Sequence, residues 1–96
     1  MPKKLRPIHP GLILKEDLED AAVSLNRLAR DIRVPMNRIS AIVNGRRSIT
    51  ADTALRLALF FGTTPQYWMN LQANYDLALA DFEAGDRIRE DVQALA

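Results

Sequence analysis

Two apolar stripes of helical spacing, separated by a very short connection, constrain this chain more than any other feature. Both lie in SLNRLARDIRVPMNRISAIVNGRR, residues 24–47. The first stripe has the spacing i, i+3, i+4 and i+7 and consists of Leu25, Leu28, Ala29 and Ile32. The second consists of Ile39, Ile42 and Val43. Only about three residues remain between the two expected helices, which must therefore pack at a steep angle, as in a helix-turn-helix.

The ends of these two helices carry matching local signals. Ser24 can accept hydrogen bonds from the first amides of the first helix. Pro35 has a φ preset for the first turn of the second helix, and Val34 before it is pushed out of the α region. Asn44-Gly45 is expected to end the second helix, because glycine readily adopts the left-handed conformation found after many helices.

The charge of the chain is concentrated in this stretch. Between residues 24 and 47 six arginines stand against one acid, Asp31, and Lys3, Lys4 and Arg6 add positive charge near the start. From residue 48 onward three arginines face seven acids, so the overall charge of +1 conceals one basic region. A helix-turn-helix inside a basic region predicts binding to double-stranded DNA.

Composition excludes several other classes. The chain has no cysteine and one histidine, so neither a thiolate metal site nor a nucleophile with its base and orienting group is expected. We therefore expect no enzyme activity and no cofactor. Neither a signal-peptide core nor a run of about 18 apolar residues is present, which predicts a soluble cytoplasmic protein without a membrane segment.

The N-terminal part is expected to combine an arm with one helix. Residues 1–9 carry two prolines and three cations and predict a flexible basic arm, which either touches DNA or is simply a frayed terminus. His9 is expected to pack against or cap the helix that Pro10-Gly11 opens and that runs to about Ala22. Its buried side is expected to comprise Leu12, Ile13, Leu14 and Leu18. Its acids Glu16, Asp17, Glu19 and Asp20 are expected to face water, where they also offer a docking surface to a basic protein.

After the two central helices, the chain predicts further helices. Thr50 is expected to cap a helix over residues 51–61 that ends at Gly62. The apolar face of that helix is formed by Ala54, Leu55, Leu57, Ala58 and Phe61. Thr64-Pro65 starts a long helix expected to reach Phe82, and Gly85 is expected to break the chain before a short helix from Arg87 to Leu95, capped by Asp86.

The long helix carries an aromatic and aliphatic stripe: Trp68, Leu71, Tyr75, Leu79 and Phe82. A small helical core cannot easily bury all of it, so we expect this stripe to form a dimer interface. For Trp68 and Leu71, closure of the monomer core is an equally weighted alternative.

The second helix of a helix-turn-helix lies in the major groove. The residues of that helix expected to read bases are Met36, Asn37, Arg38, Ser40 and Ala41. Those expected to hold the phosphate backbone are Ser24, Asn26, Arg27, Asn44, Arg46 and Arg47. For Arg30 and Arg33, phosphate contact and simple exposure to solvent are equally weighted.

Several short motifs together make the chain resemble one family. These are His9-Pro10-Gly11, then Ile42-Val43-Asn44-Gly45 with Arg46-Arg47, then Trp68-Met69-Asn70-Leu71-Gln72 followed by Tyr75-Asp76-Leu77. With them the chain resembles the HigA family of antitoxins, a branch of the phage-repressor-like helix-turn-helix proteins, from His9 to Leu95. Two positions depart from the motif: Arg33 stands where glycine is common, and Val34-Pro35 replaces a serine or threonine cap.

The resemblance implies an all-α, lambda-repressor-like domain of five to six helices over residues 10–96, with its helix-turn-helix at about 24–45 and C-terminal dimerisation helices at about 65–95. It also implies a homodimer that binds a palindromic operator, represses its own operon and neutralises a HigB-type, RelE-like ribonuclease toxin. Two alternatives stay open. One is a stand-alone transcriptional regulator without a toxin; the other is an interaction module that has lost DNA binding, against which the arginine concentration argues.

Overall fold

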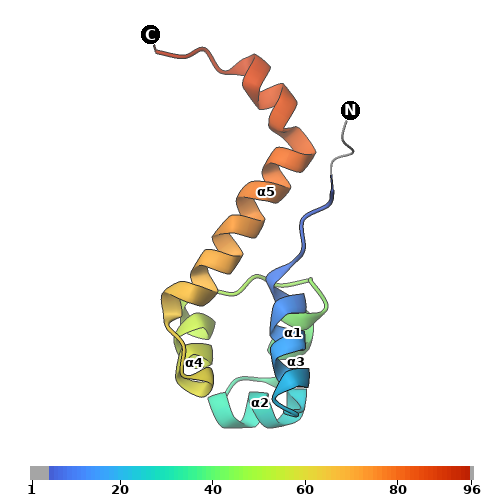
Figure 1. The fold of residues 1–96 in the computed structure, drawn as a ribbon, viewed down its shortest axis with the longest axis vertical. Coiled ribbons are helices and arrows are strands. Elements are labelled where there is room, and N and C mark those ends of the chain that lie inside the picture. The colour runs from blue at the N-terminus through green and yellow to red at the C-terminus, as the bar shows by residue number, and fades with distance from the viewer. Residues whose placement is uncertain (1–4, 96) are drawn as a thin grey trace.

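The computed structural model describes residues 5–95 and shows an all-helical arrangement over them (Figure 1). Its helices are α1 (Pro10–Asp20), α2 (Leu25–Ile32), α3 (Met36–Val43), α4 (Ala51–Phe61) and α5 (Pro65–Asp91). Helices α1 to α4 form a body with the start of α5, and the rest of α5 extends away from it, so that the molecule is 50 Å long. The expectation of an all-α helix-turn-helix fold is confirmed.

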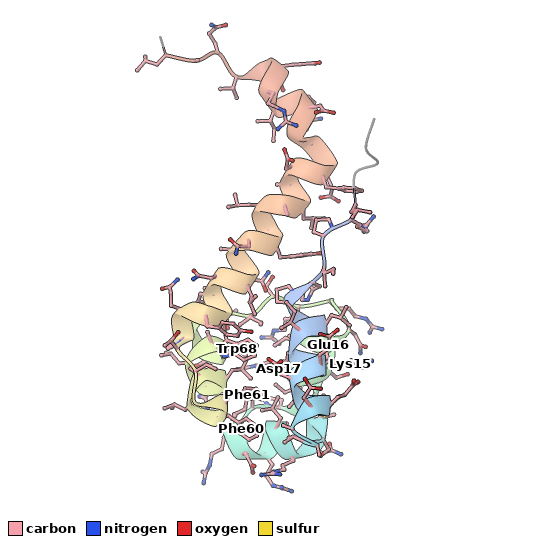
Figure 2. All side chains as sticks on the ribbon, viewed as in Figure 1. Lys15, Glu16, Asp17, Phe60, Phe61 and Trp68 are labelled. Atoms are coloured by element: carbon pink, nitrogen blue, oxygen red, sulfur yellow. The ribbon has the colours of Figure 1, made fainter. Side chains whose placement is uncertain are left out.

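The core of the body is formed where α1 and α2 pack against α3 and α4 packs against α5. Its fully buried aliphatic side chains include Leu14, Leu28, Ile39, Ile42 and Leu57. Trp68 of α5 completes this core, with none of its surface exposed, and points toward Phe61 of α4 at a ring distance of 5.5 Å (Figure 2). The indole N–H of Trp68 donates to Thr63 Oγ1 over 2.9 Å. For Trp68 the monomer-core alternative therefore holds.

The expected helix starts are confirmed by their capping hydrogen bonds. Ser24 Oγ accepts from the backbone N–H of Arg27, and Thr50 and Thr64 cap α4 and α5 in the same way. Pro35 differs from expectation, because it is the N-cap residue of α3 rather than its first helical residue. Consequently α3 begins without a side-chain cap.

Two apolar residues expected in the core are exposed instead. Leu12 of α1 and Leu55 of α4 have 43% and 56% of their surface accessible. Each lies two positions before a fully buried leucine, Leu14 or Leu57, and two positions on a helix amount to a rotation of about 200°. Thr53 of α4 is buried, although it was not among the residues expected on the apolar face of that helix. Helix α1 also ends at Asp20, two residues early, because Ala22 adopts a left-handed φ of 56°.

Helix α5 continues through Gly85 to Asp91, so the expected break and the separate helix from Arg87 to Leu95 are wrong. The guanidinium of Arg89 donates to Asp81 over 2.7 Å and to Asp86 over 2.9 Å. A Cβ at Gly85 would collide with the Asp81 carboxylate and lie 2.8 Å from Arg89. Glycine is therefore the residue that lets these ion pairs lie across the helix.

Residues 5–9 of the expected arm run beside α5 (Figure 1). The guanidinium of Arg6 lies 5.7 Å from the ring centre of Phe82, and the His9 ring meets Tyr75 edge-on at 4.9 Å. Lys3 and Lys4 lie outside the described residues.

His9 joins three elements of the body. Its Nδ1 accepts a hydrogen bond from the backbone N–H of Gly11 over 2.9 Å, which confirms the expected capping role. Gly11 packs directly against the carbonyl of Ile42 at the end of α3, where a Cβ would collide with that carbonyl. A Cβ at Gly45 would touch the His9 ring at 3.8 Å. The start of α1, the end of α3 and Tyr75 of α5 therefore meet at one imidazole.

The cap requires a neutral imidazole, and burial lowers the pKa of His9, opposed by the smaller effect of Asp76. Near pH 6 the unfolded chain therefore binds more protons than the folded one, so the free energy of unfolding rises with pH in that range and decreases on acidification. We expect the Tm to fall between about pH 7 and pH 5 by more in the wild type than in His9→Asn. Asparagine can cap but does not titrate. Parallel Tm-against-pH curves for the two proteins would contradict this assignment.

Candidate nucleic-acid interface

Helix α3 turns one face to the core and another to solvent. Ile39 and Ile42 are fully buried, whereas Met36 and Asn37 in the first turn are exposed. Ser40 and Ala41 are half-buried, and Ser40 Oγ lies 3.5 Å from the side-chain amide nitrogen of Asn44. Four of the five residues proposed to read bases thus share the outer side of this helix.

The fifth, Arg38, is directed sideways toward α4. Its Nη1 lies 3.1 Å from Asp52 Oδ1, and its side chain is only 25% exposed. The same carboxylate oxygen accepts from Arg56 Nε over 2.8 Å, and Arg56 Nη1 donates to the carbonyl of Ile32 over 2.8 Å. The hydrogen bonds that Asp52 accepts, first of all the one from Arg56 and then the one from Arg38, lower the pKa of its carboxyl.

Sequence reasoning missed this ion-pair network. The only signal in the chain was the i, i+4 spacing of Asp52 and Arg56 on one helix. The pairing of Arg38 with Asp52 spans 14 residues and depends on how α3 and α4 are packed.

The residues proposed for phosphate contact lie in two exposed segments. Ser24, Asn26 and Arg27 are exposed at the start of α2, whose cap is the Ser24 hydroxyl. Asn44, Arg46 and Arg47 are exposed in the loop after α3. Two features hold the start of that loop: Gly45 with a φ of 75°, and a hydrogen bond of 2.8 Å from the Arg46 N–H to the Ala41 carbonyl.

The cations of this surface differ in how they are paired. Asp31 lies 3.3 Å from Arg27 and 3.5 Å from Arg30, both of which remain more than half exposed. Within residues 5–95, Arg33, Arg46 and Arg47 form no ion pair with an acid. These three have the greatest freedom to meet an external anion.

Arg33 forms the turn between α2 and α3 in a left-handed conformation, with φ 57° and ψ 52°. Its N–H closes α2 onto Arg30, and the N–H of Val34 donates to the Ala29 carbonyl over 3.0 Å. A β-carbon in this conformation costs on the order of 1 kcal/mol. The turn therefore has the shape in which glycine is common, built here with arginine.

The chemistry of this surface is that of an anion-binding face: guanidinium groups, side-chain amides and exposed helix starts. No group of three or more histidine, cysteine or acidic side chains that could hold a metal ion occurs in the described part of the chain. Among the same residues, no helix has the length and hydropathy required to span a bilayer.

Comparison with known proteins gives consistent matches. A family model described as helix-turn-helix matches residues 14–68. An addiction module antidote protein of a HigA family from Coxiella burnetii is 54% identical, with a TM-score of 0.89 covering 94% of this chain and 99% of that one. The Pseudomonas aeruginosa antitoxin HigA, solved with the higBA promoter, is 41% identical, with a TM-score of 0.90 covering 95% of this chain and all of that one. Antitoxin HigA-1 of Vibrio cholerae is 39% identical over 75 residues, which are 77% of this chain and 70% of that protein.

The left-handed turn gives a direct prediction. Arg33→Gly should raise the free energy of unfolding by about 0.5–1 kcal/mol, because glycine removes the strain of the β-carbon at a positive φ. Arg33→Ala is the matched control, since it removes the same charge but keeps the β-carbon, and it should give no gain. Urea unfolding measures both variants. Equal stabilities of the glycine and alanine variants would contradict a net gain, because the relieved strain would then not exceed the extra conformational entropy that glycine loses on folding.

Proposed function

The chain belongs to the HigA family of helix-turn-helix antitoxins, and on this premise we propose that it is the antitoxin of a type II toxin-antitoxin module. In this proposal a homodimer binds a palindromic operator, represses its own operon and neutralises a HigB-type ribonuclease in the cytoplasm. The family is one of DNA-binding proteins rather than enzymes. The observation that carries the DNA-binding part is the exposed pair Arg46 and Arg47 beside the outer face of α3.

Each part of this surface suits a different part of the duplex. With α3 in the major groove, the amide of Asn37 can pair with adenine, and Met36 and Ala41 can contact thymine methyl groups. Arg46 and Arg47 lie where the loop after α3 would run along the phosphates. Arg38 is poorly placed to read bases, because Asp52 holds its guanidinium toward α4.

A palindromic operator requires two copies of α3, about 34 Å apart on one side of the duplex. We propose that they are held together by α5, through Leu71, which also packs against the core of the body, and through Tyr75, Leu79 and Phe82 further along the helix. All four are half-buried in the single chain. Trp68 supports this part of α5 from within the core but has no surface left for a partner.

Residues 5–9 also favour this face of α5 as the dimer interface. Leu5 and Ile8 are 86% and 64% exposed, and with Ala78 and Phe82 they border a hollow of about 450 Å³ between arm and helix. An apolar side chain of a second copy would fill this hollow and cover the exposed leucine and isoleucine. The opposite side of α5 carries Leu77 and Ile88, which are also exposed and offer the competing face.

The toxin part of the proposal has one physical support in the structure. Three acids, Glu16, Glu19 and Asp20, are exposed along α1. A ribonuclease needs a basic surface to bind its RNA, and an acidic helix is complementary in charge to such a surface. Co-expression with the adjacent gene tests this part. Co-purification of a small ribonuclease in an inactive complex, with footprinting of the region upstream of the pair, would support the antitoxin. DNA binding without such a partner would leave a stand-alone regulator.

The two loop arginines are expected to contact phosphate. Arg46→Ala or Arg47→Ala should weaken binding to every duplex and reduce the slope of log K against log salt by about 0.9 for each phosphate that the variant no longer neutralises. Asn37→Ala should instead relax the preference at one base pair in each half-site. Arg87→Ala, at the far end of α5, is the control for loss of one charge. An unchanged salt slope in both loop variants would refute this assignment.

The two faces of α5 can be separated by one substitution made at two positions. Ala78→Glu introduces a charge between Tyr75 and Phe82 and should convert a dimer into a monomer in sedimentation, with weaker operator binding. Ala80→Glu introduces the same charge about 200° away on the helix and should leave the dimer intact. The reverse pattern would move the interface to the side of Leu77 and Ile88. No effect of either variant would remove α5 from the interface.

A further inference from the structure

One carboxylate connects three helices at the base of the proposed DNA-binding surface. Asp52, in the first turn of α4, holds Arg38 of α3 at 3.1 Å and Arg56 of α4 at 2.8 Å through the same oxygen. Arg56 in turn donates to the last carbonyl of α2, that of Ile32. The side chain of Asp52 itself is 60% exposed, so the network is open to solvent beside α3.

The network changes what Arg38 can do. Arg38 is the third residue of α3, and its neighbour Asn37 is exposed on the outer face, whereas three quarters of the Arg38 side chain is covered. Its Nε is buried and makes no hydrogen bond within residues 5–95. The ion pair with Asp52 is therefore the contact that orients this guanidinium, and it neutralises a cation in the first turn of the helix.

The surrounding charges show why this pairing matters. Residues 24–64 contain seven arginines and only two acids, Asp31 and Asp52. A free arginine in the first turn of α3 would reach phosphates of any duplex, because phosphate contacts add affinity without regard to sequence. An arginine already paired with a carboxylate releases fewer counterions when DNA binds, so it adds less to sequence-independent affinity.

We propose that Asp52 is a specificity-determining residue: by holding Arg38 against α4, it keeps the first turn of α3 from binding phosphates of arbitrary sequence. The inference depends on the DNA binding proposed above. Asp52 acts through Arg38 and touches no DNA itself, so it is a positioning residue. Discrimination then rests on the outer face of α3, while Arg46 and Arg47 supply the sequence-independent attraction.

The test compares Asp52→Asn with the wild type on the upstream operator duplex and on a scrambled duplex of equal length, over a series of salt concentrations. Loss of the carboxylate frees Arg38, so affinity for scrambled DNA should rise about 3- to 10-fold, and its salt slope should steepen by about 0.9 per protomer. Operator affinity should change less, so the ratio of the two affinities should fall. Glu90→Gln, near the end of α5, is the control for the same change in net charge.

A second variant separates release of Arg38 from a general charge effect. In Arg38→Gln, the added Asp52→Asn change should no longer raise affinity for scrambled DNA, because no guanidinium is left to release. Thermal unfolding checks that each variant is folded. If Asp52→Asn does not fold, Asp52→Ser takes its place, because serine is favourable at the start of a helix.

Three results would overturn the inference. One is an unchanged affinity ratio in Asp52→Asn. Another is an equal gain with and without Arg38. The last is a parallel loss of stability and operator affinity, which would show that Asp52 only joins the helices. Failure of the wild type to prefer its operator would instead refute the proposed function, so the two failures are distinguishable.

Discussion

The connection between α2 and α3 is the constraint on which the rest of the molecule depends. Three residues join the helices, and the first, Arg33, turns the chain in a left-handed conformation. So short a link forces a steep crossing, which the small side chain of Ala29 permits and the burial of Leu28 and Ile39 stabilises. The crossing fixes which side of α3 faces solvent. Because α1 rests on the end of α3 through Gly11, the same crossing also places the N-terminal helix.

The arginines around this crossing differ in whether a nearby acid neutralises them. Asp31 and Asp52 each hold two arginines, whereas the loop after α3 presents two arginines without an acidic partner in the described chain. Exposed ion pairs of this kind contribute little to stability, so their main effect lies in how much positive charge each place presents. Arginines without an acidic partner in the described chain therefore lie on both sides of α3: Arg33 in the turn before it, and Arg46 and Arg47 in the loop after it.

Many of the helix boundaries could be predicted from the sequence because the interactions that set them are local. A hydroxyl before a helix, as at Ser24 and Thr64, needs only its neighbours in the chain to act as a cap. The choice between Leu12 and Leu14 for the core depends on where other helices lie, and local periodicity does not carry that information. Gly85 was misleading because the helix continues past it, with Arg89 one turn later paired across the glycine to Asp81 one turn earlier. The contact between Arg38 and Asp52 exists only once α3 and α4 are packed.

The length of α5 has a consequence for spacing on DNA. Its 27 residues extend about 40 Å, and only its first turns are anchored in the body by Trp68. If two chains pair along the outer part, the point at which the helices cross sets the distance between the two DNA-reading faces. Sliding that point by one turn of each helix would shift each body by about 5.4 Å, against a duplex repeat of roughly 34 Å. Relatives with the same reading residues but a different crossing point would then select operators with different gaps between half-sites.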